Sequence, residues 1–328
     1  MKRVVYPKFG VPDKILEIRE EPSLVPQAGE VVIRLEAAPI HLADLHHIAG
    51  LPYFDQYEPP GTPGYEGVGR ILAVGPKVSG AHPGDRVFLP IRFGAWCEEC
   101  VASADNLWTA PDHIPAEQLA LVPINMTTAY LLLTTVATLK SGDWIIQNAG
   151  NSNVASYVIR FARRLGLHTI NIVRRSSLLV RLEALGGDLN VVHTENLAEC
   201  LRELGIGPVR LALDAIGGDW CARLAQCLAQ DGGIVATYGL ASGKPCQLPG
   251  ELLIFRSVLV RGFYMTRALH DLGPDGAEET RNALNRFLGD EPPSATIAAV
   301  YPISEVRTAV AHAARTGSAR EGKIILTL

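Results

Sequence analysis

The sequence predicts an α/β domain with a doubly wound parallel sheet, accompanied by a second domain that is rich in β-strands. From Met126 onward, segments with helical periodicity alternate with short apolar and β-branched runs, as is typical of a parallel sheet covered by helices. Before about Val122 the chain contains short alternating segments, with Gly and Pro recurring at intervals of roughly 8–12 residues. That spacing favours a small β-barrel or β-sandwich.

At 328 residues the chain is long for a single domain, so two domains are expected. We assign the α/β domain to residues 123–264 and the β-rich domain to residues 1–122 together with 265–328. The C-terminal segment contains two predicted helices, at 278–288 and 303–315, and a final strand. Because so few elements cannot bury a core of their own, this segment is expected to return to the first domain.

Composition and charge restrict the classes of partner. The hydrophobic fraction is 48% and the net charge is −4, with no basic run that would indicate nucleic-acid binding. No apolar stretch is long enough to span a membrane, and the N-terminal segment lacks the apolar region of a signal peptide. The six cysteines show no pattern of a secreted disulfide framework. We therefore expect a cytoplasmic protein with reduced thiols that acts on a small molecule.

The segment 143–177 has the layout of a βαβ unit that binds a dinucleotide. A short apolar strand (Trp144–Gln147) leads into a loop of small residues at 148–153. An amphipathic helix (Val154–Leu165) and a β-branched strand (His168–Val173) follow. Backbone N–H groups and the helix dipole favour an anion where the loop meets the helix, so the pyrophosphate is expected there. The predicted contacts are Asn151, Ser152, Asn153 and Val154.

Basic residues, rather than an acid, follow the second strand of this unit. An NAD-binding enzyme carries an Asp or Glu at this position, which binds the ribose hydroxyl. Arg174 and Arg175 can instead hold a 2′-phosphate by charge-assisted hydrogen bonds, and the Ser176 hydroxyl adds a further donor. The pattern predicts NADPH as the cofactor. The alternative is that two basic residues at a strand end are simply solvated.

Five short motifs occur in order along nearly the whole chain. They are Ile40–Asp44, Pro63–Gly69, Gly84–Val87, Asp214–Gly218 and Gly322–Leu326. Taken together, these motifs resemble the medium-chain dehydrogenase/reductase superfamily. The resemblance implies a GroES-like β-rich catalytic domain and a Rossmann domain that binds the dinucleotide.

Four further segments narrow the resemblance. They are Asn125–Tyr130, Trp144–Ser152, Thr169–Arg174 and Arg261–Tyr264. These segments are similar to the zinc-free branch of 2-enoyl thioester reductases and quinone reductases, and to the mitochondrial type of enoyl reductase in particular. The resemblance implies NADPH-dependent reduction of a carbon–carbon double bond conjugated to a carbonyl. A quinone oxidoreductase and a non-catalytic NADPH-binding protein remain as alternatives.

The same resemblance implies positions for further cofactor contacts and for a subunit interface. Asn125 and Thr128 would lie near the nicotinamide, and Lys323 would contact a phosphate. Homodimerisation through the strand at 258–262 is also implied. The residues expected to flank the bound cofactor are Tyr238, Gly239, Leu240, Phe263 and Tyr264.

A tyrosine is the candidate acid for double-bond reduction. Hydride addition at the β-carbon places negative charge on the carbonyl oxygen, so a hydroxyl donor aimed at that oxygen lowers the barrier. In the enoyl thioester reductases a Tyr precedes the Gly-rich Glu motif by an interval similar to that between Tyr53 and Glu66. Tyr57 is the rival for this role, and a packing function is open for both tyrosines. The second candidate catalytic residue, His41, is either a polar residue that lines the nicotinamide pocket or a structural histidine.

Neither of two possible metal sites is predicted to hold an ion. Cys97 and Cys100 are spaced like zinc ligands, but a structural zinc needs four ligands and no further Cys lies nearby in the sequence. Zinc-dependent alcohol dehydrogenases have a His ligand where this chain has Tyr65. An alcohol dehydrogenase of that type would have to draw its ligands from His41, His46 and Glu66.

Two departures from the family pattern concern the cofactor and the substrate. Asn153 and Ala155 stand where the family usually has Gly, and the Asn side chain is expected to crowd the pyrophosphate. A degenerate loop with only a structural role is the alternative at this position. Enoyl reductases tend to have a Trp soon after the segment that begins here at Gly262, whereas residues 267–269 are Arg-Ala-Leu. A smaller or more polar activated alkene is therefore as compatible as a long fatty thioester.

Overall fold

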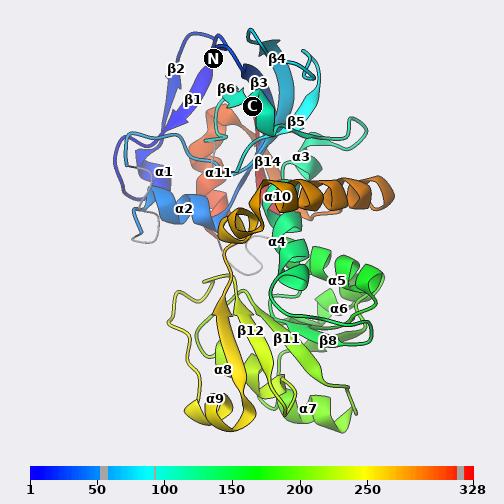
Figure 1. Ribbon diagram of the computed structural model, residues 1–328. Helices are drawn as coiled ribbons and strands as arrows, with labels where there is room; N and C mark the ends of the chain where they lie inside the picture. Colours follow the sequence, from blue (N-terminus) through cyan, green and yellow to red (C-terminus); the bar gives the residue numbers. More distant parts are fainter. Residues whose placement is uncertain (52–57, 92–93, 316–320) are drawn as a thin grey trace. The chain divides into compact units, whose positions relative to one another are not determined.

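The computed structural model describes residues 1–51, 58–91, 94–315 and 321–328, and the chain divides into two compact units (Figure 1). Unit 1 comprises Met1–Ile124 and Ala283–Leu328, and unit 2 comprises Asn125–Asn282. The second boundary differs from the one predicted after residue 264. It falls after Asn282, within α10 (Met265–Asp290), whose two helical segments meet at a kink at the non-helical residue Gly273.

Unit 2 is built on a parallel sheet, which has six strands in the part of the chain described. The strands are β8 (Trp144–Gln147), β9 (His168–Val173), β10 (Leu189–Val192), β11 (Val209–Asp214), β12 (Gly233–Thr237) and β13 (Val258–Gly262). Their order is β10-β9-β8-β11-β12-β13, and every neighbouring pair is parallel. This is the doubly wound Rossmann order, in which the winding reverses between β8 and β11. The fold class predicted for this part of the chain is confirmed.

Helices cover both faces of this sheet. They are α5 (Asn153–Leu165), α6 (Leu179–Ala184), α7 (Leu197–Glu203), α8 (Trp220–Cys227) and α9 (Gly250–Arg256), with a short 3-10 turn η2 (Ser176–Leu178). The preceding helix α4 (Val122–Thr134) contacts α5 through the rings of Tyr130 and Phe161. Side chains of successive strand residues point to opposite faces. On one face Ile146 and Ile172 pack with residues of α7, α8 and α9. On the other, Val173 packs with Ile159 of α5 and Leu182 of α6.

A row of amide side chains crosses the interior of this sheet. Gln147, Asn171 and Asn190 occupy paired positions on β8, β9 and β10. Gln147 Nε2 donates to Asn171 Oδ1 (2.6 Å), and Asn171 Nδ2 donates to Asn190 Oδ1 (2.9 Å). Gln147 and Asn171 are fully buried, and these hydrogen bonds satisfy the Gln147 Nε2 group and the Asn171 amide, which are costly to bury unpaired, whereas Gln147 Oε1 has no partner in the described chain. The row therefore favours one pairing register for three strands.

Unit 1 is rich in β-strands, as predicted, and its main sheet has seven strands in the residues described. They are β3 (Glu30–Ile40), β4 (Val68–Val74), β5 (Arg86–Phe88), β6 (Glu99–Ser103), β7 (Trp108–Thr109), β14 (Ile297–Pro302) and β15 (Lys323–Thr327). The long strand β3 is central, because it pairs antiparallel with β4, β6 and β15. The C-terminal strands thus complete a sheet that begins near the N-terminus. A separate hairpin is formed by β1 (Lys2–Val5) and β2 (Glu17–Glu20).

Short helices pack around this sheet. They are α1 (Pro12–Ile15), α2 (Leu42–Ile48), α3 (Ala116–Leu119) and α11 (Val306–Ala313), with 3-10 turns η1 (Ala104–Asn106) and η3 (Ile303–Glu305). The core of unit 1 joins Ile33 of β3, Trp96 and Val310 of α11 in one buried cluster. The Trp96 indole N–H donates to the Pro39 carbonyl (3.2 Å), which satisfies its polar atom inside that cluster. Among the helices of the residues described, none has both the length and the apolar composition needed to cross a bilayer.

Candidate functional site

The carboxyl ends of β8 and β11 are adjacent where the winding reverses, and doubly wound sheets bind their ligands at this point. Asn148 follows β8; its Nδ2 donates to Asp214 Oδ1 (2.7 Å), and its Oδ1 accepts from the Ala215 N–H (2.8 Å). Asp214 Oδ1 also accepts from the N–H groups of Ile216 and Gly217, at 2.9 Å each. These bonds tie together the two loops that leave this edge of the sheet.

The loop between β8 and α5 presents the N-terminus of α5 at the same edge. Ser152 is the N-cap, and its Oγ accepts from the Ala155 N–H (3.1 Å). The Gly150 N–H donates to the Ile172 carbonyl (2.9 Å), and a Cβ on Gly150 would lie 3.1 Å from that oxygen. The other N–H groups of the first turn, together with the dipole of this 13-residue helix, can hold a phosphate.

Asn153 lies in the helix rather than in the loop, which corrects the predicted helix start at Val154. The helix α5 begins at Asn153, and the left-handed residue of the loop is Ala149, with φ of 48°. The Asn153 side chain is buried, and its Nδ2 has no hydrogen-bond partner among the residues described. This amide can therefore donate to a ligand, which is a different role from the steric obstacle expected from the sequence.

Several buried polar atoms at this edge lack a protein partner. Within the described chain they include Asn153 Nδ2 and Thr237 Oγ1. The Tyr238 hydroxyl is buried beside Ser152, and burial raises the pKa of Tyr238, so the hydroxyl stays protonated at neutral pH. A buried polar group without a partner costs free energy. The arrangement thus fits a bound dinucleotide, whose hydroxyl, amide and phosphate groups supply both donors and acceptors.

Arg174, Arg175 and Ser176 directly follow β9. Arg174 and Ser176 are exposed, and Arg175 is half-buried. No carboxylate lies between Val173 and Leu178 to bind a ribose hydroxyl. Two guanidinium groups and a hydroxyl at this strand end can bind a 2′-phosphate.

The remaining predicted cofactor residues of unit 2 lie on α4 and at the strand ends. Asn125 and Thr128 are buried one turn apart on α4. Gly239 follows β12, and a Cβ there would clash with the Ala215 carbonyl, so this close approach requires Gly. Asn151 and Val154 flank the start of α5, and Leu240, Phe263 and Tyr264 follow β12 and β13.

In unit 1, His41, Glu66 and Lys323 form a connected polar group. His41 follows β3, and Lys323 begins β15, which pairs with the end of β3. His41 Nε2 lies 2.6 Å from Glu66 Oε1, and Lys323 Nζ lies 3.2 Å from His41 Nδ1. Glu66 Oε2 accepts from the Ile124 N–H (2.6 Å). Because an ammonium can only donate, the neutral ring accepts at Nδ1 and carries its proton on Nε2, facing the carboxylate.

Burial controls the ionisation of the carboxyl groups around His41. Glu66 is fully buried, and burial raises its pKa to about 8, although the Ile124 N–H and the Lys323 charge act in the opposite direction. Asp44 Oδ2 accepts from the His41 N–H (2.7 Å) at the start of α2. Burial raises the pKa of Asp44 to about 6, against the lowering influence of His41. Both carboxyls therefore bind protons more readily in the folded state.

Among the described residues, those near His41 do not assemble the ligand set of a catalytic zinc. Tyr65 stands where a ligand His is expected, and its hydroxyl lies 3.0 Å from His47 Nδ1. The other ring nitrogen of His47 lies 3.0 Å from the Tyr6 hydroxyl. Both ring nitrogens of His41 are engaged, one of them by an ammonium that repels cations. This geometry disfavours the zinc-dependent alcohol dehydrogenase alternative.

Cys97 and Cys100 are buried thiols near the start of β6. Cys97 Sγ donates to the Gly94 carbonyl (3.4 Å). Burial raises the pKa of Cys97 to about 11 and also raises that of Cys100. No group of three potential metal ligands in the described residues includes either thiol.

Some sequence-predicted residues lie outside the structure described, and some site residues were not predicted. Tyr53 and Tyr57 fall within 52–57, outside the described residues, so the choice between them stays a prediction. Asn148 was not predicted, although a polar residue directly after a buried strand is a usable signal. The contact between His41 and Glu66 has no such signal, because it depends on how distant segments of unit 1 fold together.

We expect Glu66 to make the stability of the protein depend on pH. Between its ordinary pKa of 4.5 and its folded value of about 8, the folded state binds the extra proton. The free energy of unfolding therefore falls as pH rises through this range, by at most about 1.4 kcal/mol per pH unit. Urea unfolding at a series of pH values above the Asp44 pKa of about 6 isolates the effect.

The comparison variant is Glu66→Gln, which removes the titrating proton and should flatten this slope. Glu203→Gln, on the exposed face of α7, serves as the matched control and should leave the slope unchanged. An identical slope in wild type and Glu66→Gln would show that Glu66 does not titrate in this range.

Comparisons with known proteins support one family. Residues 27–121 match the alcohol dehydrogenase GroES-like domain. Over 273 residues the chain is 38% identical to the mitochondrial enoyl-[acyl-carrier-protein] reductase of Xenopus tropicalis, covering 80% of this chain and 77% of that protein. A proposed NADPH:quinone reductase from Bacillus thuringiensis has a TM-score of 0.90 at 29% identity, covering 100% of this chain and 98% of the other. A mycobacterial protein solved with NADPH has a TM-score of 0.85 at 25% identity, with 100% of both chains covered.

These similarities confirm the family that the motifs predicted. The GroES-like match lies within unit 1, and the relative from Xenopus tropicalis is matched over more than two thirds of its length. The chain belongs to the enoyl-[acyl-carrier-protein] reductase family, in the zinc-free branch of the medium-chain dehydrogenase/reductase superfamily.

Proposed function

We propose that the protein is an NADPH-dependent reductase of carbon–carbon double bonds conjugated to a carbonyl, with 2-enoyl thioesters or related enones as substrates. The observation that carries this proposal is the 38% identity to an enoyl-[acyl-carrier-protein] reductase over most of both chains. Unit 2 supports it with a Rossmann strand order and a capped helix at the switch point.

NADPH is the cofactor that the residues of unit 2 fit. The first turn of α5 would hold the pyrophosphate, and the Asn153 amide is placed to donate to it. Arg174 and Arg175 would hold the 2′-phosphate. When bound, the nicotinamide supplies a hydride for the β-carbon of the substrate.

The chain itself must supply a proton and stabilise the charge on the substrate carbonyl oxygen. We assign this donor to Tyr53, because a tyrosine hydroxyl with its ordinary pKa of about 10 stays protonated at neutral pH. His41 is less suited to direct proton transfer, because both its ring nitrogens are within hydrogen-bond distance of Glu66 and Lys323. We assign His41 a positioning role, in which its ring orients the Lys323 ammonium.

The reaction can be tested by following NADPH absorbance with crotonyl-CoA, a quinone and a simple enone in parallel. We expect crotonyl-CoA to give the highest kcat/KM. Tyr53→Phe keeps the ring but removes the donor, so kcat with crotonyl-CoA should fall by about 10²–10⁴-fold. Tyr57→Phe is the matched control and should retain the wild-type rate.

Two outcomes of that assay would count against the proposal. Full activity of Tyr53→Phe would refute the acid assignment but leave the reaction class intact. Binding of NADPH without its oxidation by any of the three acceptors would favour the non-catalytic alternative.

A quinone reductase is the second candidate function. The 29% identity to the Bacillus thuringiensis protein favours it. The Arg-Ala-Leu sequence at 267–269, where enoyl reductases tend to have a Trp, is also consistent with a substrate other than a long thioester. A higher kcat/KM with the quinone than with crotonyl-CoA would establish this alternative.

Arg174 and Arg175 are expected to set the preference for NADPH over NADH. Replacing both with Ala removes hydrogen bonds to a charged group worth about 1.5–3 kcal/mol each, so the KM for NADPH should rise at least about a hundredfold. The KM for NADH, which lacks the 2′-phosphate, should change little. Arg202→Ala, at an exposed position on α7, is the control. An equal rise for both cofactors would contradict a 2′-phosphate contact.

We also propose that the protein forms a homodimer through the β13 edge of the sheet. In the described residues β13 is the last strand of that sheet, so one of its edges has no strand partner. Leu259 is 61% exposed on β13, and Ile254 and Phe255 are 72% and 80% exposed on the adjoining α9. Large apolar side chains beside an unpaired strand edge favour association.

Analytical ultracentrifugation tests the dimer. The wild-type protein should sediment as a dimer, and Phe255→Glu combined with Leu259→Lys should shift it to monomer by placing charges in the interface. Val180→Glu, at a position 73% exposed on α6, is the control and should remain dimeric. A monomeric wild-type protein would overturn this part of the proposal.

A further inference from the structure

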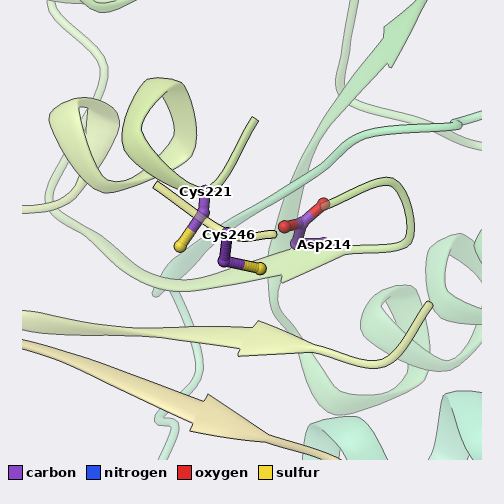
Figure 2. Close-up of side chains that lie close together, drawn as sticks. All are labelled: Asp214, Cys221 and Cys246. Atoms are coloured by element: carbon purple, nitrogen blue, oxygen red, sulfur yellow. The ribbon is translucent and has the colours of Figure 1, made fainter. Parts of the chain in front are cut away.

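We propose that Asp214, Cys221 and Cys246 form a binding site for a thiophilic divalent cation such as Zn²⁺. In the residues described, these three form the group whose potential ligand atoms all lie within 4.8 Å of one another. Figure 2 shows them on separate segments, with the Cys246 thiol turned toward the Asp214 carboxylate. The site uses none of the residues around Tyr65, where the zinc-dependent relatives bind their metal.

The three residues are held near one another by the fold of unit 2. Asp214 ends β11, Cys221 lies in the first turn of α8, and Cys246 lies between β12 and α9. The segment that carries Cys246 is bound to the β11–α8 loop, because the Gln247 N–H donates to the Gly218 carbonyl (3.1 Å). The cluster therefore does not depend on a ligand for its assembly.

Asp214 has an oxygen atom available for an ion. Its side chain is fully buried and its Oδ1 accepts the three hydrogen bonds at the switch point, two from backbone N–H groups and one from the Asn148 amide. Its Oδ2 has no hydrogen-bond partner in the described chain. A carboxylate oxygen that is buried and unpaired is costly, and a bound cation would offset that cost.

Both thiols lie close to the Asp214 carboxylate, with the potential ligand atoms of the three residues within 4.8 Å of one another. Cys221 is fully buried and Cys246 is exposed, so an ion can reach the cluster from the Cys246 side. On binding, the thiol protons of Cys221 and Cys246 leave to solvent as two metal–sulfur bonds form. No electrons are transferred, so no oxidant is required.

The donor set selects the class of ion. Two thiolates with one carboxylate oxygen suit Zn²⁺, whereas Mg²⁺ and Ca²⁺ prefer oxygen ligands alone. Zinc–sulfur bonds of about 2.3 Å place two thiolates about 3.8 Å apart in a tetrahedral site. The potential ligand atoms of the three residues lie within 4.8 Å of one another, so at most a small movement is needed to bind the ion. Cys246 can make this movement because it is exposed. Water would take the fourth position.

The test uses the full-length protein, reduced, treated with a chelator and desalted, with Co²⁺ as a spectroscopic probe and Zn²⁺ as competitor. We expect one Co²⁺ per chain with thiolate-to-cobalt charge-transfer absorption, and its displacement by Zn²⁺. Cys246→Ser should abolish this absorption and weaken Zn²⁺ binding by at least about tenfold. Because Cys246 is exposed, this variant is expected to fold normally, which circular dichroism checks.

Cys227→Ser is the matched control, since Cys227 also lies on α8 but its Sγ donates to the Arg223 carbonyl (3.3 Å) outside the cluster. It should bind Co²⁺ like the wild type. Cobalt bound without charge-transfer absorption, or absorption that survives in Cys246→Ser, would overturn the site. The readout involves no substrate, so its result is independent of the proposed reductase activity.

Discussion

The carboxyl edge of the Rossmann sheet depends on one buried carboxylate, that of Asp214. Removing a carboxylate from water is costly unless donors surround it, and Asp214 Oδ1 meets this condition with the Asn148 amide and two backbone N–H groups. These donors belong to the loops that follow β8 and β11. Their hydrogen bonds to Asp214 therefore also fix the positions of the two loops relative to each other. The hydrogen bonds that stabilise the Asp214 side chain therefore also hold the two loops of the predicted cofactor site in place.

Unit 1 contains a second buried carboxyl group, that of Glu66. Glu66 is fully buried, yet it contacts His41, the Ile124 N–H and, through the imidazole, Lys323. The imidazole lies between the Glu66 carboxyl group and the Lys323 ammonium and is within hydrogen-bond distance of both. This arrangement keeps an ammonium oriented beside β3, where a free lysine side chain would sample many rotamers.

The sequence was sufficient for the parallel sheet because its strands are short apolar runs, bounded by Gly or polar residues and separated by amphipathic helices. It was insufficient at Asn153, where the N-cap Ser152 started the helix one residue earlier than apolar periodicity indicated. The unit boundary after Asn282 was not predicted, because it falls inside the second helical segment of α10, beyond the break at Gly273. Contacts such as that between Cys221 and Cys246 depend on loop paths, which no local pattern encodes.

The hydrogen-bonded amides of Gln147, Asn171 and Asn190 on β8, β9 and β10 limit which substitutions each of these positions can accept. Replacing Asn171 alone by an aliphatic residue removes the donor to Asn190 Oδ1 and leaves Gln147 Nε2 with only the Ala155 carbonyl, whereas replacing all three residues together removes the hydrogen bonds between these side chains at once. A substitution at one of these three positions is therefore expected to destabilise the protein more than an aliphatic replacement of all three together. Descendants of this chain should retain the three amides as a set or lose them as a set.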